Sequence, residues 1–229
     1  MATYSILSLG SRRDVKQFRK GAAEKLGLSE GAVVTGAKPS LAAIKALFGR
    51  SDDVLFLAGH YVSSLYNEDS TIDLAFANDK LTITYDGQVT QLARGTGLKQ
   101  TGPKLVIWGG CSVCSKDATI ATMRALFGPH VMIGWIGQTG WEITDIMFGG
   151  KGHGNTGTEP LPTFATPNFF DALGGSITDA TKLWKAWLQV ANGIAWGNAP
   201  NDGGPYIDRF CAVDTGGTKH LPADSGSGV

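Results

Sequence analysis

The sequence contains little cysteine, no long apolar run and no excess of charge of either sign. Its 229 residues include 3 cysteines, Cys111, Cys114 and Cys211, which are too few for a disulfide framework and leave one thiol unpaired. That count favours a reducing, cytoplasmic setting. No apolar stretch reaches the length of a membrane-spanning helix, and the first residues lack the charged and apolar segments of a signal peptide.

Positive and negative charges balance. Lys and Arg number 20, Asp and Glu number 20, and neither a basic run nor a basic helix face is present. We therefore expect no nucleic-acid partner and no binding to an anionic membrane surface. An apolar fraction of 42% and a charged fraction of 17% describe an ordinary globular chain with enough apolar material for a sizeable core.

Apolar patterns alternate between strand-like and helix-like along the chain. We expect buried strands at residues 3–9, 32–35, 53–58, 104–109, 131–136 and 206–213, and helices at 12–26, 40–48, 117–127 and 176–195, with Ser40 and Ser176 as N-caps. Alternation and turn residues within 71–92 predict a small β-hairpin excursion. The fold class is thus α/β, a mostly parallel sheet with helices on both faces, as one domain over 1–215 followed by a mobile tail over 216–229.

Two of the expected strands end in glycine followed by a reactive side chain. The first run leads through Gly59 to His60, and the run at 104–109 leads through Gly110 to Cys111. The carboxyl ends of neighbouring parallel strands meet at one edge of a sheet, so the imidazole and the thiol are expected there together. A Cys beside a His is the combination that forms a thiolate nucleophile with a proton shuttle. The backbone N–H groups of Gly110 and Cys111 are candidate donors to an oxyanion.

These segments resemble a known family. Leu-Phe-Leu-Ala-Gly-His60, the hairpin-bearing stretch, and Leu-Val-Ile-Trp-Gly-Gly-Cys111-Ser are similar to the caspase-like cysteine peptidases with the caspase–haemoglobinase fold, and most of all to the CHAT-type bacterial branch. The unit from Ala121 to Trp135 is also similar to that branch, so the resemblance covers roughly residues 50–140. The separation of 51 positions between His60 and Cys111 suits the spacing of about 50 residues in caspases.

The resemblance implies a hydrolase, a thiol protease in which Cys111 is the nucleophile and His60 the proton shuttle. Its substrates would be proteins or peptides, it would need neither cofactor nor metal, and it leaves room for a regulatory protein partner. One departure concerns the residue after the histidine. Family members have a glycine there whose N–H helps form the oxyanion hole, whereas this chain has Tyr61. That donor role carries over to the backbone of Tyr61, and the change also supports an alternative, a catalytically inactive peptidase-like binding module.

The substrate pocket is expected just after the strand at 131–136. Peptidases of this fold recognise a charged or amide side chain before the scissile bond. Glu142 and Asp145 follow that strand and would favour a basic residue, with Trp141 as a pocket wall. Asp73 and Asp117 are weaker candidate acids. The alternative for each acid is an ordinary solvated carboxylate.

The pair Cys111-Ser-Val-Cys114 supports a rival function. Such Cys-x-x-Cys pairs carry out thiol–disulfide exchange or supply half of a zinc site. A structural zinc site needs a second close pair of ligands, which neither Cys211 nor the scattered histidines provide, so we expect no metal. If Cys111 acts alone, Cys114 is expected to be a small buried residue in the turn that follows it.

Overall fold

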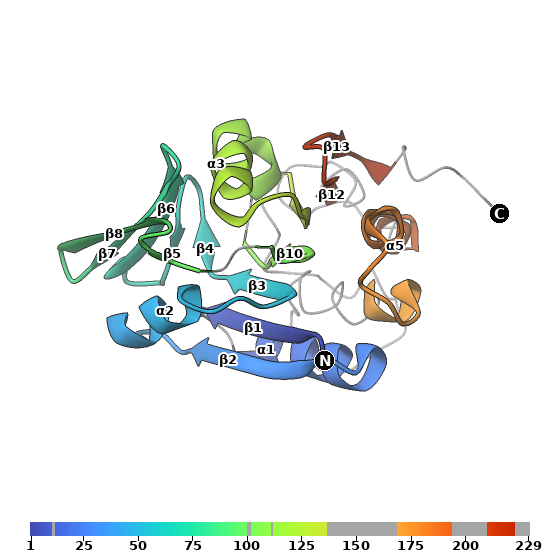
Figure 1. The fold of residues 1–229 in the computed structure, drawn as a ribbon, viewed down its shortest axis with the longest axis horizontal. Coiled ribbons are helices and arrows are strands. Elements are labelled where there is room, and N and C mark those ends of the chain that lie inside the picture. Colours follow the sequence, from blue (N-terminus) through green and yellow to red (C-terminus); the bar gives the residue numbers. More distant parts are fainter. Residues whose placement is uncertain (11, 100–101, 111, 137–168, 194–209, 223–229) are drawn as a thin grey trace, which may run out of the picture.

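Two sheets organise the part of the chain that the computed structural model describes, which is residues 1–10, 12–99, 102–110, 112–136, 169–193 and 210–222. The larger sheet has seven strands in the order β13-β12-β11-β10-β3-β1-β2 (Figure 1). The strands are β1 (Thr3–Ser8), β2 (Ser29–Thr35), β3 (Val54–Ala58), β10 (Leu105–Trp108), β11 (Val131–Trp135), β12 (Phe210–Val213) and β13 (Lys219–His220). Neighbours from β2 to β11 pair in parallel, and β12 and β13 add in antiparallel fashion. The mostly parallel sheet predicted from the sequence is confirmed.

Helices cover both faces of this sheet because apolar side chains alternate between its faces. One face carries α1 (Arg12–Lys20), the π-helical turn η1 (Gly21–Lys25) and α5 (Ala180–Gly193). The other face carries α2 (Leu41–Phe48), α3 (Asp117–Phe127) and the second sheet. In β3, Phe56 belongs to the first apolar cluster and stacks on Phe18 at 4.7 Å, whereas Leu55 and Leu57 belong to the second cluster. The predicted helices on both faces are therefore confirmed.

The second sheet begins at His60 and is larger than the hairpin excursion expected from the sequence. It has six strands in the order β4-β5-β6-β7-β8-β9, namely β4 (His60–Tyr61), β5 (Leu65–Tyr66), β6 (Ile72–Ala77), β7 (Lys80–Tyr85), β8 (Gln88–Arg94) and β9 (Gly97–Leu98). The predicted turns Asn78-Asp79 and Asp86-Gly87 have positive φ at all their residues, as tight hairpins require. Sequence analysis missed β4, β5 and β9, which are two residues long and too short for any periodicity to show, and it did not assign the seven-residue β8 as a strand.

The sequence predicts serine N-caps at α2 and α5, and the prediction for α5 is wrong. The Ser40 hydroxyl accepts a hydrogen bond from the Ala43 N–H at 3.2 Å at the start of α2, which confirms that cap. At α5, however, the carboxylate of Asp179 accepts the Lys182 N–H at 3.0 Å. Ser176 caps nothing in α5, because Asp179 directly precedes the first helical residue and also has a suitable side chain.

The larger sheet continues beyond residue 215, where a mobile tail was expected. β13 pairs with β12, and the His220 ring stacks on Trp184 of α5 at 4.0 Å. His220 Nε2 also lies 2.9 Å from Asp214 Oδ2, and the Asp214 carboxylate accepts the N–H groups of Gly216 and Thr218. Residues 223–229 of the expected tail lie outside the described residues. The folded domain therefore includes at least His220.

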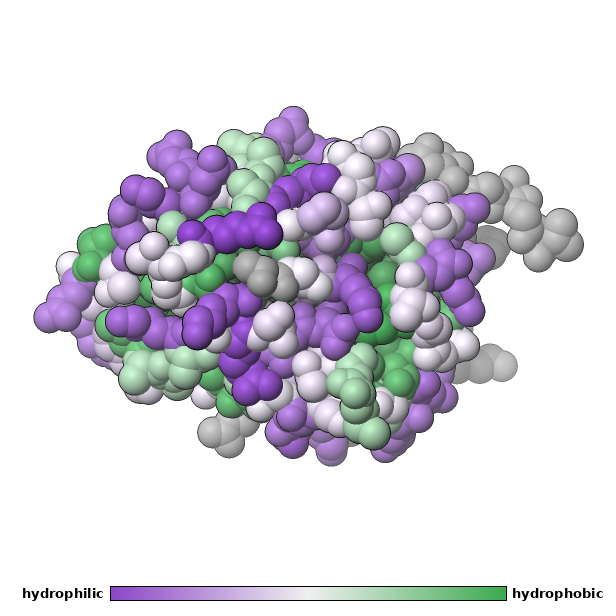
Figure 2. All heavy atoms as spheres, viewed as in Figure 1, coloured by the Kyte–Doolittle hydropathy of each residue, from purple (hydrophilic) through white to green (hydrophobic). Residues whose placement is uncertain are grey.

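The visible surface is largely polar. Figure 2 shows hydrophilic residues over most of one face, with apolar residues in separate groups over the second sheet and beside α5. In the described ranges the large apolar side chains with the highest exposure are Met1, Val62, Val89 and Leu221. No helix in these ranges is long and apolar enough to cross a bilayer.

His130, between α3 and β11, is a buried titratable group. Its side chain is 2% exposed, and Nδ1 donates to the carbonyl of Gly128 at 2.7 Å. Burial lowers the pKa of His130 to about 4, with the charge of Arg124 adding to the shift and the Gly128 hydrogen bond opposing it. In an unfolded chain an imidazole takes up its proton near pH 6.5.

We predict that His130 makes stability fall with acidification. Between about pH 6.5 and pH 4 the unfolded chain binds one proton more than the folded chain, so stability that is complete at pH 7 is lost as the pH falls. His130→Asn keeps a donor for Gly128 and removes the titration. Urea unfolding at pH 7 and pH 5 should show a loss smaller by about 2 kcal/mol in the variant than in the wild type. Equal losses in the two proteins would contradict the prediction.

Candidate active site

β3 and β10 lie side by side and end at the same edge of the larger sheet. They pair in parallel, with Leu57 opposite Trp108, and the Gly109 N–H donates to the Leu57 carbonyl at 2.8 Å. The residue that follows Gly59 is His60, and the residue that follows Gly110 is Cys111. The structure thus brings together the two strand ends that the sequence singled out. Cys111 itself lies outside the described residues, although both of its chain neighbours are described.

Glycines allow these two strand ends to touch. A Cβ atom on Gly110 would lie 2.9 Å from the Gly59 carbonyl oxygen and 3.0 Å from the Cβ of Tyr61. A Cβ atom on Gly109 would lie 2.9 Å from the Cβ of Ala58. Any side chain at these positions would push the segments after β3 and β10 apart, because closely packed neighbouring atoms cannot move aside. The segment before His60 is therefore held directly against the segment before residue 111.

The topological switch point of the sheet lies next to this contact, between β1 and β3. In the parallel part the strand order is β2-β1-β3-β10-β11, so the chain winds one way from β1 and the other way from β3. In open α/β sheets ligands bind outside the carboxyl ends of the strands at such a point. The Leu9 N–H donates to the Ala58 carbonyl at 2.8 Å and ties the end of β1 to the end of β3. His60 follows β3 after Gly59 and lies beside this switch point, where this class of fold binds its ligands.

His60 and Tyr61 lie on opposite faces of the second sheet. His60 is half-buried, and its ring stacks on Tyr66 with centroids 5.4 Å apart and planes 23° apart. Tyr61 is buried, its hydroxyl donates to Thr119 Oγ1 of α3 at 2.9 Å, and burial raises the pKa of its phenol. Its ring also packs edge-on against Trp108 at 5.3 Å. Tyr61 stands where the caspase-like peptidases have a glycine. It is an ordinary strand residue here, and its side chain anchors β4 to α3.

Tyr66 is a site residue that sequence analysis missed. Its contact with His60 depends on the pairing of β4 with β5, in which His60 lies opposite Tyr66. Two-residue strands carry no periodic signal, and the three residues between them contain no turn motif that would have fixed the register. No sequence feature marks this tyrosine beyond its aromatic character.

The turn after residue 111 is tightly folded. Ser112 has a left-handed backbone with φ 56°, and its carbonyl accepts the N–H of Ser115 at 3.0 Å and the Ser115 hydroxyl at 2.9 Å. The 3₁₀ turn η2 (Val113–Ser115) then leads into α3.

The residues predicted to line the substrate pocket are outside the described part of the chain: Trp141, Glu142 and Asp145.

Cys114 is buried within this turn. Its side chain is 0% exposed and its thiol lies 3.8 Å from the Cys211 carbonyl oxygen. Burial, together with the contact to Cys211, raises the pKa of the Cys114 thiol well above its usual value. The thiolate needed for disulfide exchange is therefore disfavoured at Cys114. The expectation of a small buried residue in the turn is confirmed.

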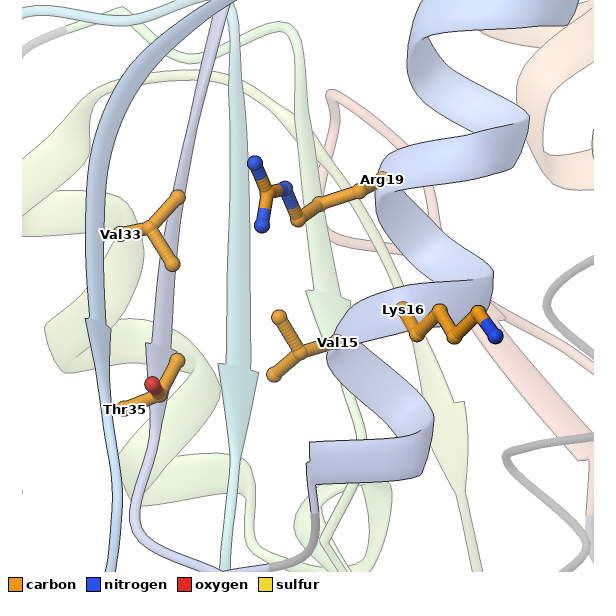
Figure 3. Close-up of a pocket in the computed structure, with 5 residues that line it drawn as sticks. All are labelled: Val15, Lys16, Arg19, Val33 and Thr35. Atoms are coloured by element: carbon orange, nitrogen blue, oxygen red, sulfur yellow. The ribbon is translucent and has the colours of Figure 1, made fainter.

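A separate hollow of about 390 Å³ lies between α1 and the edge strand β2 (Figure 3). Its lining residues are Val15, Lys16, Arg19, Val33 and Thr35. Figure 3 shows Arg19 extending toward the strand and Lys16 pointing away from it. The guanidinium of Arg19 is already paired, with Nε 2.7 Å from the Glu30 carboxylate. Within the described ranges, moreover, His, Cys, Asp and Glu side chains form no group of three or more able to hold a metal ion.

The Gly59–Gly110 contact leads to a prediction about stability. Gly110→Ala should lower the free energy of unfolding by about 1–3 kcal/mol, because the added methyl group meets backbone and Cβ atoms that cannot move away cheaply. Gly10→Ala is the matched control at the end of β1, where an added Cβ meets nothing within 4 Å. Chemical denaturation of both variants measures the difference. Equal stabilities of the two variants would show that the strand ends are not in contact.

Comparison of the sequence with known proteins identifies no relative. No model of a known protein family matches the chain. A search of curated proteins likewise finds no significantly similar sequence. The function is therefore argued from the residues and their geometry.

Proposed function

We propose that this chain is a cysteine endopeptidase of the caspase-like type, with a Cys111–His60 dyad. The observation that carries the proposal is the contact between Gly59 and Gly110, which follow the neighbouring strands β3 and β10 at the carboxyl edge of the sheet, beside the switch point between β1 and β3. His60 follows one of these glycines and Cys111 follows the other. A half-buried imidazole beside a strand-end thiol is suited to deprotonate it.

In the proposed reaction the Cys111 thiol transfers its proton to His60 and the sulfur attacks the peptide carbonyl carbon. The oxyanion that forms is stabilised by backbone N–H groups, for which Tyr61, Gly110 and Cys111 are the candidates. His60 then donates the proton to the leaving amine, and a thioester to Cys111 remains. Water, deprotonated by His60, attacks the thioester and releases the acid product and the free thiol.

Two observations weigh on the alternative functions. The burial of Cys114 speaks against redox chemistry, because exchange requires a resolving thiol that can ionise and be reached. The accommodation of Tyr61 in β4 weakens the case for an inactive binding module, since the residue keeps its backbone in an ordinary strand conformation. Cys114 and Cys211 are free thiols, and three cysteines are too few for a disulfide framework, so we propose that the enzyme works in the reducing cytoplasm.

We further propose that the substrate carries a basic residue before the scissile bond. From residue 60 to residue 98 the second sheet contains the acids Glu68, Asp69, Asp73, Asp79 and Asp86 but only the bases Lys80 and Arg94. Asp73 lies opposite Tyr66, which in turn lies opposite His60, so all three side chains share one face. A carboxylate on the sheet face that carries the imidazole attracts a cationic substrate.

The dyad predicts a clear pattern of cysteine dependence. Cys111→Ala should abolish cleavage of a denatured protein substrate, and His60→Ala should slow it at least about a hundredfold because the proton shuttle is lost. Cys114→Ala is the matched control and should retain activity, since this thiol is buried in the turn. Gel-based cleavage assays with reductant present measure all three. Cleavage by Cys111→Ala would refute the dyad, and loss of cleavage in Cys114→Ala would contradict the structural role of Cys114.

The proposed acidic specificity residue predicts a basic residue before the cut. Mass spectrometry of products from a peptide library should show Lys or Arg there. Replacing the carboxylate that binds this basic residue by its amide should reduce kcat/KM for basic substrates and leave kcat/KM for neutral substrates unchanged. Asp73→Asn, Glu142→Gln and Asp145→Asn identify which acid is responsible. A preference for acidic or apolar residues in the wild type would contradict the proposed specificity.

A further inference from the structure

The contact between His60 and Tyr66 is a cross-strand aromatic pair. The two residues are direct partners in the β4–β5 pairing, so their side chains leave the sheet on the same face. The ring centroids are 5.4 Å apart and the planes are within 23° of parallel, so one face of the imidazole lies against the phenol ring. The contact is therefore one between ring faces.

Tyr66 is itself held by a rigid turn. The next residue, Asn67, is 1% exposed, and its side chain donates to the Ala37 carbonyl at 2.8 Å and accepts the Ile72 N–H at 2.8 Å. The Asn67 N–H donates to the Ile72 carbonyl at 3.2 Å, closing the β5–β6 turn. These bonds tie β5 both to the neighbouring strand and to the segment after β2. The phenol ring of Tyr66 therefore belongs to a strand, β5, whose backbone position is fixed by hydrogen bonds.

The backbone around His60 gives the imidazole less support. β4 consists of two residues, and Tyr61 sends its side chain to the opposite face, toward α3. A Cβ atom on Gly59 would lie 3.0 Å from the Tyr66 carbonyl oxygen, so the strand that carries Tyr66 also packs against the residue before His60. Rotation of the imidazole about its Cβ–Cγ bond is broad in the absence of packing. A stacked ring restricts that rotation.

We propose that Tyr66 is the positioning residue of the dyad: its stacked ring fixes the plane of the His60 imidazole for proton exchange with Cys111. This inference rests on the proposed function and adds a residue that acts through His60 and does not touch the substrate. The ring is the part of Tyr66 that matters. The positive charge that His60 gains during the reaction lies over the phenol face, where an aromatic ring stabilises a cation.

Three variants test the inference. Tyr66→Leu removes the ring, and Tyr66→Phe keeps it while removing only the hydroxyl. Tyr85→Leu is the matched control, because Tyr85 is another half-buried tyrosine of the same sheet, opposite Ile72 and away from His60. The measurements are kcat and KM on one peptide, the alkylation rate of Cys111 by iodoacetamide, and the NMR shifts of the His60 ring protons. Cys114 and Cys211 are buried, so alkylation of the native protein reports on Cys111.

For Tyr66→Leu we expect kcat and the alkylation rate to fall about three- to tenfold with KM nearly unchanged, the size of one aromatic pair contact. The His60 ring protons should move downfield as the ring current is lost. Tyr66→Phe and Tyr85→Leu should stay within about twofold of the wild type and keep the shifts. Wild-type behaviour of Tyr66→Leu, or an equal loss in Tyr66→Phe, overturns the inference. A wild type that cleaves nothing overturns the proposed function and the catalytic role of Tyr66 with it, while the NMR shifts separately decide whether the stack exists.

Discussion

The close contact of glycines at the ends of β3 and β10 is the constraint on which the site depends. With any side chain at Gly110, the chain after β10 would be forced away from the Gly59 carbonyl, which lies 2.9 Å from the position of a Cβ. Neighbouring parallel strands already bring the two ends to one edge, but only glycine lets the backbones touch there. His60 and Cys111 are the residues that follow these glycines in the chain, and the glycine contact is the physical basis of the proposed dyad.

The second sheet turns this edge into a site with two different sides. Strand alternation places Tyr61 inward, bonded to Thr119 of α3, and His60 outward against Tyr66. β4 is thus anchored to α3 by Tyr61 and carries the imidazole of His60 on its other face. Burial of the inward face fixes the register, because a slip by one residue would expose Tyr61 and bury His60. The orientation of His60 is therefore coupled to the packing of the second sheet on α3.

The sequence predicted the parts of the fold that have a periodic pattern. The α/β class, the helices on both faces and the strand ends at His60 and Cys111 follow from apolar runs that stop at glycine. The size of the second sheet and the Tyr66 contact did not follow, since they depend on strands two residues long whose pairing is decided by tertiary packing. The Ser176 cap was mistaken because two capping residues lie three positions apart and only the exact helix start separates them.

The central claim is that Cys111 is an activated nucleophile paired with His60. Its most direct test is the rate at which a peptidyl electrophile ending in arginine labels the native protein, relative to iodoacetamide, with the labelled residue located by mass spectrometry. We expect selective labelling of Cys111, far faster than that of a free thiol and dependent on His60. Labelling no faster than that of a free thiol, or undiminished labelling in His60→Ala, would contradict it.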